Sequence, residues 1–224
     1  MDCSLITCYN HIYKELIFGG DGMKTVEEKV KDKLRRASQG TLFSLDDFQS
    51  AGTYESVKKT VNTLVGEGSL IRVYKGIYQK PKFSEFLNMT ISASPREIAE
   101  KYAQKYKWDI APAGDIALNI LGLDTQVPHI YEYISDGPNR TITLDNGTKI
   151  TFKHVLQKET KLSRNSSLVI EALKHLGKEA ITDEDLKKIL SKLDSVQFKQ
   201  LQQDSKNTRV WIQELIKRMG EFHV

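Results

Sequence analysis

The chain has 224 residues, of which 39% are hydrophobic and 28% charged, and its formal net charge is +4. This composition is typical of a globular protein and excludes disordered and fibrous classes. The length fits one large domain or two to three small ones, so internal boundaries are sought before a fold is named.

Residues 1–22 hold both cysteines, Cys3 and Cys8, and end in a glycine-rich stretch. Two cysteines cannot make a disulfide framework, which suits a reducing cytosol, and together with His11 they lack a fourth metal ligand. The segment has no basic start, and charged residues interrupt its apolar stretch, so we expect neither a signal peptide nor a membrane span. We predict a flexible extension over residues 1–22 of a cytoplasmic protein, with Met23 as an alternative start.

Residues 23–82 are predicted to form a small domain that begins with a helix. Val26, Val30 and Leu34 recur at every fourth position, which makes one apolar stripe on a charged helix over residues 24–37. This single stripe predicts a helix that packs through one face and leaves its charged face in solvent.

Two further helices follow within the same domain. Ser44 is the predicted N-cap of a short second helix, because two aspartates occupy its first turn. Thr53 is the predicted N-cap of a third helix over residues 54–65, whose core face includes Val57 and Val61.

A β-hairpin closes the domain. Residues 70–74 and 77–80 are rich in β-branched and aromatic side chains, and Lys75-Gly76 between them supplies the turn before Pro81. Three short helices followed by a basic hairpin is the element order of a winged helix-turn-helix. We therefore predict a winged helix-turn-helix DNA-binding domain over residues 23–82.

Positive charge is concentrated in this domain. Residues 24–82 hold 12 Lys and Arg against 7 Asp and Glu, whereas the remainder of the chain is close to neutral. A local excess of this sign attracts the phosphate backbone of nucleic acids.

A second module, over residues 83–160, has the pattern of a small α+β domain. Ser94 and Pro95 are an N-cap and a first-turn proline for a helix that ends near Tyr106. Another helix follows and stops at Gly122. Strand patterns then occupy residues 129–134, 140–144 and 148–155.

Residues 161–224 return to helical periodicity, with helices predicted over residues 168–176, 182–193, 195–203 and 208–219. An apolar stripe in the last helix comprises Trp211, Ile212, Leu215 and Ile216. Such a stripe is usually core and less often a partner groove or dimer face. The predicted fold class is α+β: a winged helix-turn-helix, a small α+β domain and a C-terminal helical region.

The exposed face of the third helix carries residue types that bind DNA. In helix-turn-helix docking such a helix enters the major groove, where Ser, Asn and Lys bond base edges, and a wing contacts the backbone or minor groove. The predicted contacts are Thr53, Tyr54, Ser56, Lys58, Lys59 and Asn62 on the helix and Arg72, Tyr74, Lys75 and Lys80 on the hairpin. For any one of these residues, a solvated or packing role is an equally good interpretation.

Two stretches resemble a known family. Residues 64–72, with Lys75-Gly76-Ile77-Tyr78 and Pro81, look like the N-terminal domain of AbiEi-type antitoxins from type IV toxin-antitoxin systems. The Pro-Ala-Gly-Asp run at residues 112–115 and the run Leu-Gly-Leu-Asp-Thr-Gln-Val-Pro at residues 121–128 are similar to the signature after the wing in AbiEi-like proteins. The resemblance spans residues 24 to about 156, although the second stretch also has a purely structural interpretation.

The resemblance implies a DNA-binding antitoxin that represses its own operon. It also implies neutralisation of a nucleotidyltransferase-like toxin without a stable complex, with residues 83–160 as the antitoxin-like domain. Duplex DNA is the expected partner, and a homodimer on DNA fits this interpretation. The alternative is a stand-alone winged-helix regulator whose second module senses a ligand or dimerises.

An enzyme is the least favoured interpretation. The carboxylates that could hold magnesium have no familiar spacing, and neither His154 nor His175 has a serine or cysteine signature beside it. No phosphate-binding glycine motif is present. The candidate carboxylates are Asp115, Asp124, Asp136 and Asp145, with Lys149 nearby. We expect no catalytic residue, no cofactor and no metal ion.

Overall fold

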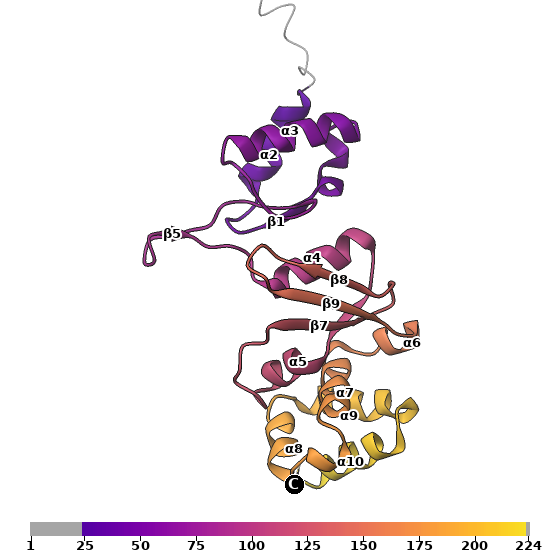
Figure 1. Ribbon diagram of the computed structural model, residues 1–224. Helices are drawn as coiled ribbons and strands as arrows, with labels where there is room; N and C mark the ends of the chain where they lie inside the picture. Colours follow the sequence, from indigo (N-terminus) through magenta and orange to yellow (C-terminus); the bar gives the residue numbers. More distant parts are fainter. Residues whose placement is uncertain (1–23, 223–224) are drawn as a thin grey trace, which may run out of the picture.

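The computed structural model describes residues 24–222 and arranges them in three successive units. In Figure 1 the N-terminal helices lie at one end, a β-sheet with its helices lies in the middle, and the C-terminal helices lie at the other end. The protein is a mixed α+β chain with a C-terminal helical segment, as predicted. The predicted extension over residues 1–22 lies outside the described residues. Among residues 24–222, no helix has the length and hydropathy needed to cross a bilayer.

The N-terminal unit packs two α-helices and a 3₁₀ helix on a three-stranded antiparallel sheet, whose strand order is β1-β3-β2. Its elements are α2 (Val26–Arg36), β1 (Leu42–Ser44), η1 (Leu45–Ala51), α3 (Tyr54–Gly66), β2 (Ile71–Tyr74) and β3 (Ile77–Gln79). The predicted core face of α3 is confirmed, because Val57, Val61 and Leu64 are at most 1% exposed. They pack with Val30 of α2.

A two-stranded ribbon follows, formed by β4 (Phe83–Ser84) and β5 (Met89–Thr90). It projects from the body of the molecule in Figure 1. The chain then enters the middle unit.

The middle unit is a four-stranded sheet of order β6-β7-β9-β8 with two helices. Its elements are α4 (Pro95–Tyr106), β6 (Ile110–Pro112), α5 (Gly114–Leu121), β7 (Ile130–Ser135), β8 (Arg140–Thr143) and β9 (Lys149–His154). Strands β7 and β9 are parallel, and the other pairs are antiparallel. The three strands predicted from the sequence match β7, β8 and β9 to within one residue at each end.

Helix α4 joins the middle unit to the N-terminal one. It packs against β1 and β3, so the small N-terminal sheet is covered by helices of both units. Ile77 of β3 is fully buried with Ile98 and Tyr102 of α4 in a core that continues to Phe152 of β9. The two units therefore share part of one hydrophobic core.

The C-terminal unit is helical. Its elements are α6 (Gln157–Thr160), α7 (Arg164–Leu176), η2 (Lys178–Ala180), α8 (Asp183–Leu190), α9 (Ser195–Asp204), η3 (Ser205–Asn207) and α10 (Val210–Glu221). The apolar stripe of the last helix is core: Ile212 and Ile216 are at most 1% exposed, and Trp211 and Leu215 pack beside them. Helix α5 contacts α7 and links this core to the sheet.

Some elements differ from the sequence-based expectation. Strands β1 and β6 and the β4–β5 ribbon were not predicted, and the short second helix is the 3₁₀ helix η1. Helix α7 begins at Arg164 rather than Leu168, because the Ser163 hydroxyl accepts a hydrogen bond from the Ser166 backbone N–H at 3.2 Å.

Candidate nucleic-acid interface

The N-terminal end of α3 is held by its cap. The Thr53 hydroxyl accepts a hydrogen bond from the Ser56 backbone N–H at 3.4 Å and lies 2.9 Å from the Ser56 hydroxyl. Thr53 and Ser56 are exposed, and Tyr54 between them is 59% exposed. These three predicted contact residues thus lie together on the surface at the start of α3.

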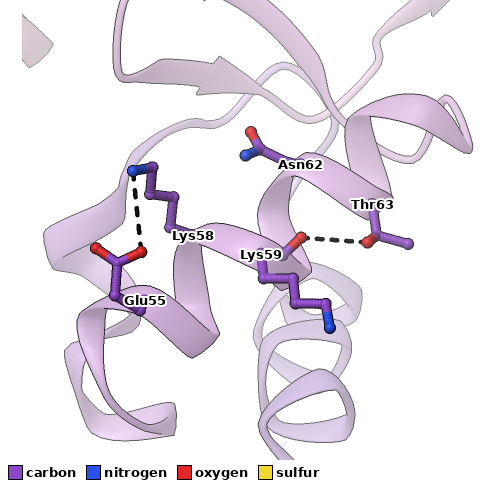
Figure 2. A pocket seen from close by; sticks show the side chains of 5 residues that line it. All are labelled: Glu55, Lys58, Lys59, Asn62 and Thr63. Atoms are coloured by element: carbon purple, nitrogen blue, oxygen red, sulfur yellow. Dashed lines mark hydrogen bonds and ion pairs between the residues drawn. The ribbon is translucent and has the colours of Figure 1, made fainter.

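The outer face of α3 is polar and carries two lysines, which Figure 2 shows with Glu55, Asn62 and Thr63 around a shallow hollow. The Lys58 Nζ lies 3.9 Å from the Glu55 Oε2. Lys59 points away from this pair in Figure 2 and forms no ion pair with any described residue. The Thr63 hydroxyl donates to the Lys59 carbonyl at 3.2 Å. Lys59 is therefore available for an external anion.

The β2–β3 turn lies close to α4, and a glycine in the turn makes this possible. Gly76 has a φ of +76°, a left-handed conformation that side-chain-bearing residues rarely adopt, and an added Cβ would lie 2.6 Å from the Lys105 ammonium of α4. Arg72 and Lys75 are exposed on this hairpin, while Tyr74 is half-buried with its ring centroid 6.0 Å from that of Tyr102. The turn thus brings two cations, Arg72 and Lys75, close to Lys105 of α4.

A groove lies between α3, the β2–β3 turn, α4 and β8. Its volume is about 550 Å³. Lysine and arginine contribute Lys58, Arg72, Lys75, Lys105 and Arg140, and tyrosine contributes Tyr54, Tyr74, Tyr78, Tyr102 and Tyr106. Of the described residues that line it, none is Asp or Glu. We call it the basic-aromatic groove.

The residues of the basic-aromatic groove that the sequence did not assign to the interface include Tyr102, Lys105 and Tyr106 of α4 and Arg140 of β8. They lie about 20 to 60 positions beyond the hairpin in the sequence, and only the packing of α4 on the N-terminal sheet brings them there. The only signal in the sequence was Lys105 in the last turn of α4 with Lys107 at its C-cap, and this signal is weak.

Tyr102 and Arg140 form a contact in the groove that shifts the pKa of both side chains. Burial raises the pKa of the Tyr102 hydroxyl, and its hydrogen bond with Arg140 offsets only part of this effect. The same contact raises the pKa of Arg140. The groove therefore presents a neutral phenol beside a cationic guanidinium at neutral pH.

Lys80 lies elsewhere and has another role. Its ammonium donates hydrogen bonds of 2.8 Å to the carbonyls of Leu34 and Ala37, which are at the C-terminal end of α2. A cation at this position satisfies free carbonyls and opposes the negative end of the helix dipole. We therefore assign Lys80 to the fold and leave it out of the interface, in contrast to the sequence-based expectation.

The candidate carboxylates of an enzyme are not brought together. Asp115 pairs with His175 at 2.9 Å on the surface, and Asp136 accepts a hydrogen bond from the Asp109 backbone N–H at 2.8 Å. Within residues 24–222, no three His, Cys, Asp or Glu side chains form a group that could hold a metal ion. Cys3, Cys8 and His11 lie outside the described residues.

Comparison with known proteins identifies the family. Residues 29–201 match the family of unknown function DUF6088, and the chain belongs to this family. No curated protein matches the chain. Among solved structures, the RV2827C protein from Mycobacterium tuberculosis is similar at 11% sequence identity over 88% of this chain and 76% of that chain, with a TM-score of 0.46.

Proposed function

We propose that the protein binds duplex DNA through the outer face of α3 and the β2–β3 turn, and that it represses transcription from its own promoter. The observation that carries the proposal is the cluster of exposed cations on these two elements, beside a groove whose described lining residues include no carboxylate. Cations that neutralise phosphates supply most of the affinity for DNA.

The element order supports a winged helix-turn-helix interpretation. Helix α3 follows α2 and η1 and precedes the hairpin of β2 and β3, which is the order in which a recognition helix precedes a wing. Ser56 and Asn62 on the exposed face of α3 have side chains that can bond base edges, whereas Lys59 and Arg72 suit phosphates.

The experiment compares repression and binding for two classes of variant. Ser56→Ala with Asn62→Ala is expected to lower the preference for the protein's own upstream duplex over a scrambled one by about tenfold or more, because base-edge contacts carry discrimination. Lys59→Ala with Arg72→Ala is expected to weaken binding to both duplexes. Lys149→Ala, an exposed lysine of β9 outside the proposed interface, is the control. Unchanged repression in both double variants would contradict the proposal.

We propose further that the protein is a cytoplasmic antitoxin of a type IV toxin-antitoxin system, as the sequence resemblance implies. Its functional partner would be a nucleotidyltransferase-like toxin encoded beside it, with no requirement for a stable complex. The near-neutral residues 83–224 are too large to serve as a spacer for the basic N-terminal unit, and this supports a second activity.

Genetic rescue tests the antitoxin role. The adjacent toxin gene is expressed with the full chain carrying Lys59→Ala and Arg72→Ala, and growth is scored against the wild-type chain. We expect rescue to persist while repression is lost. A truncation is a poorer test, because removal of residues 24–82 would uncover Ile98 and Tyr102, which pack on that unit. Loss of rescue in this variant, with its expression verified, would contradict separate activities.

One observation favours the alternative of a stand-alone regulator that senses a ligand. A cavity of about 260 Å³ lies between β6, β7 and α7. The hydroxyls of Tyr133 and Ser167, both lining residues, are buried without a hydrogen-bond partner among the described residues. Unpaired buried hydroxyls are costly, and a small polar ligand would satisfy them. A solitary gene with its own inverted repeat would favour this alternative, whereas an adjacent toxin gene would favour the antitoxin.

A further inference from the structure

We infer that the basic-aromatic groove binds an unpaired nucleotide, that is, an aromatic base that carries a phosphate. The inference deepens the proposed function, on which it rests for the nucleic-acid character of the ligand. The groove overlaps the outer face of α3 at Lys58 and Asn62 but extends beyond it, because Lys59 does not line the groove and Lys105, Tyr106 and Arg140 do.

The tyrosines are the first argument. Tyr54 of α3 is 59% exposed and Tyr106 of α4 is 43% exposed, so two helices present aromatic rings to the same groove. In a duplex the faces of the bases are stacked on one another and only their edges are accessible. Aromatic side chains therefore gain stacking only from bases that are unpaired.

The cations beside these rings are the second argument. The Lys58 ammonium lies 5.9 Å from the Tyr54 ring centroid, and the Lys105 ammonium lies 5.2 Å from that of Tyr106. Each ring thus has a cation at the distance where a phosphate of a stacked nucleotide can be neutralised. Arg140 adds a planar guanidinium, which binds phosphate oxygens in pairs.

The size and charge of the groove agree with this ligand. A volume of about 550 Å³ is in the range of small-molecule sites. Because none of its described lining residues is Asp or Glu, nothing in the described lining repels a phosphate. The same residues recognise a free mononucleotide or an unpaired nucleotide within a strand, and the experiment distinguishes these sources.

The test uses two single-stranded probes with the full chain: 3′-labelled hexathymidylate and an abasic hexamer with the same phosphates. Anisotropy titrations of the wild type are expected to give about tenfold tighter binding of the hexathymidylate, since stacking adds affinity that phosphates alone do not. Tyr106→Leu removes an aromatic ring and leaves the net charge unchanged, and it is expected to abolish most of this preference. Arg140 is exposed, and Arg140→Ala is expected to weaken the binding of both probes. Lys149→Ala is expected to leave the affinity for both probes unchanged.

The outcomes separate this inference from duplex binding. Equal affinity of the wild type for both probes, or an unchanged preference in Tyr106→Leu of native circular dichroism, would overturn the inference. If the wild type prefers hexathymidylate over the abasic hexamer but does not bind the duplex, only the duplex proposal is contradicted. Displacement of the hexamer by adenosine monophosphate supports a free nucleotide as ligand, and a base preference without displacement supports a nucleotide held within a strand.

Discussion

Lys101 of α4 and Asp47 of η1 form an ion pair with 2.7 Å between Nζ and Oδ2, and this pair joins the middle unit to the N-terminal one. The Lys101 side chain is only 9% exposed. Asp47 also accepts a hydrogen bond from the Ser44 backbone N–H at 2.6 Å. Burial opposes the ionisation of Asp47, but the hydrogen bonds from Lys101 and Ser44 outweigh it and hold the pKa of this carboxyl below its ordinary value.

Asp47→Asn is expected to lower the free energy of unfolding by about 2 kcal/mol at pH 7, because it leaves the buried Lys101 ammonium without its counter-charge. The pKa of Asp47 is lower in the folded state, so its stabilisation is present above the unfolded value, near 4, and fades as pH falls through the folded value. Urea unfolding at several pH values measures this. The difference from wild type should be full at pH 7 and shrink in acid, and Asp46→Asn, an exposed neighbour, is the control. A difference that grows towards low pH would contradict the assignment.

Lys80→Ala is expected to destabilise the N-terminal unit by about 1 to 2 kcal/mol, since the carbonyls of Leu34 and Ala37 lose their donor. Thermal unfolding compared with Lys82→Ala, an exposed lysine two positions away, measures the effect. The salt dependence of DNA binding should be the same in Lys80→Ala and the wild type. A smaller salt slope without a loss of stability would return Lys80 to the interface.

Ile216→Ala is expected to lower the free energy of unfolding by about 2 to 5 kcal/mol, because it opens a cavity in the core of the C-terminal unit. Val210→Ala at the start of the same helix, where the side chain is 69% exposed, should cost less than about 0.5 kcal/mol. Chemical denaturation distinguishes the two. Equal stabilities would mean that the stripe on α10 is surface rather than core.

The parts of the fold that were predictable have local causes. Thr53 caps α3 and Ser94 with Pro95 opens α4, and both signals depend on residues within a few positions of each other. Strands β1 and β6 were not predictable, because three residues are too short to show an alternating pattern and β6 includes Pro112.

The candidate site likewise has one part that the sequence predicts and another that depends on the fold. The exposed face of α3 follows from helical periodicity once Val57 and Val61 are assigned to the core. The roles of Lys80 and Arg140 depend on contacts between distant segments, which periodicity does not contain: Lys80 donates to a carbonyl at the end of α2, and Arg140 forms a hydrogen bond with Tyr102 of α4. Lys80 was therefore placed in the interface by its charge and its position at the exit of the hairpin, and Arg140 was left out.

The central claim, that α3 and the β2–β3 turn bind the phosphates of duplex DNA, is tested most directly by the salt dependence of affinity for the protein's own upstream duplex. The logarithm of the binding constant should fall linearly with the logarithm of salt concentration, and Lys59→Ala and Arg72→Ala should each reduce this slope by about 1, while Lys149→Ala leaves it unchanged. A wild-type slope that neither Lys59→Ala nor Arg72→Ala alters would contradict the claim.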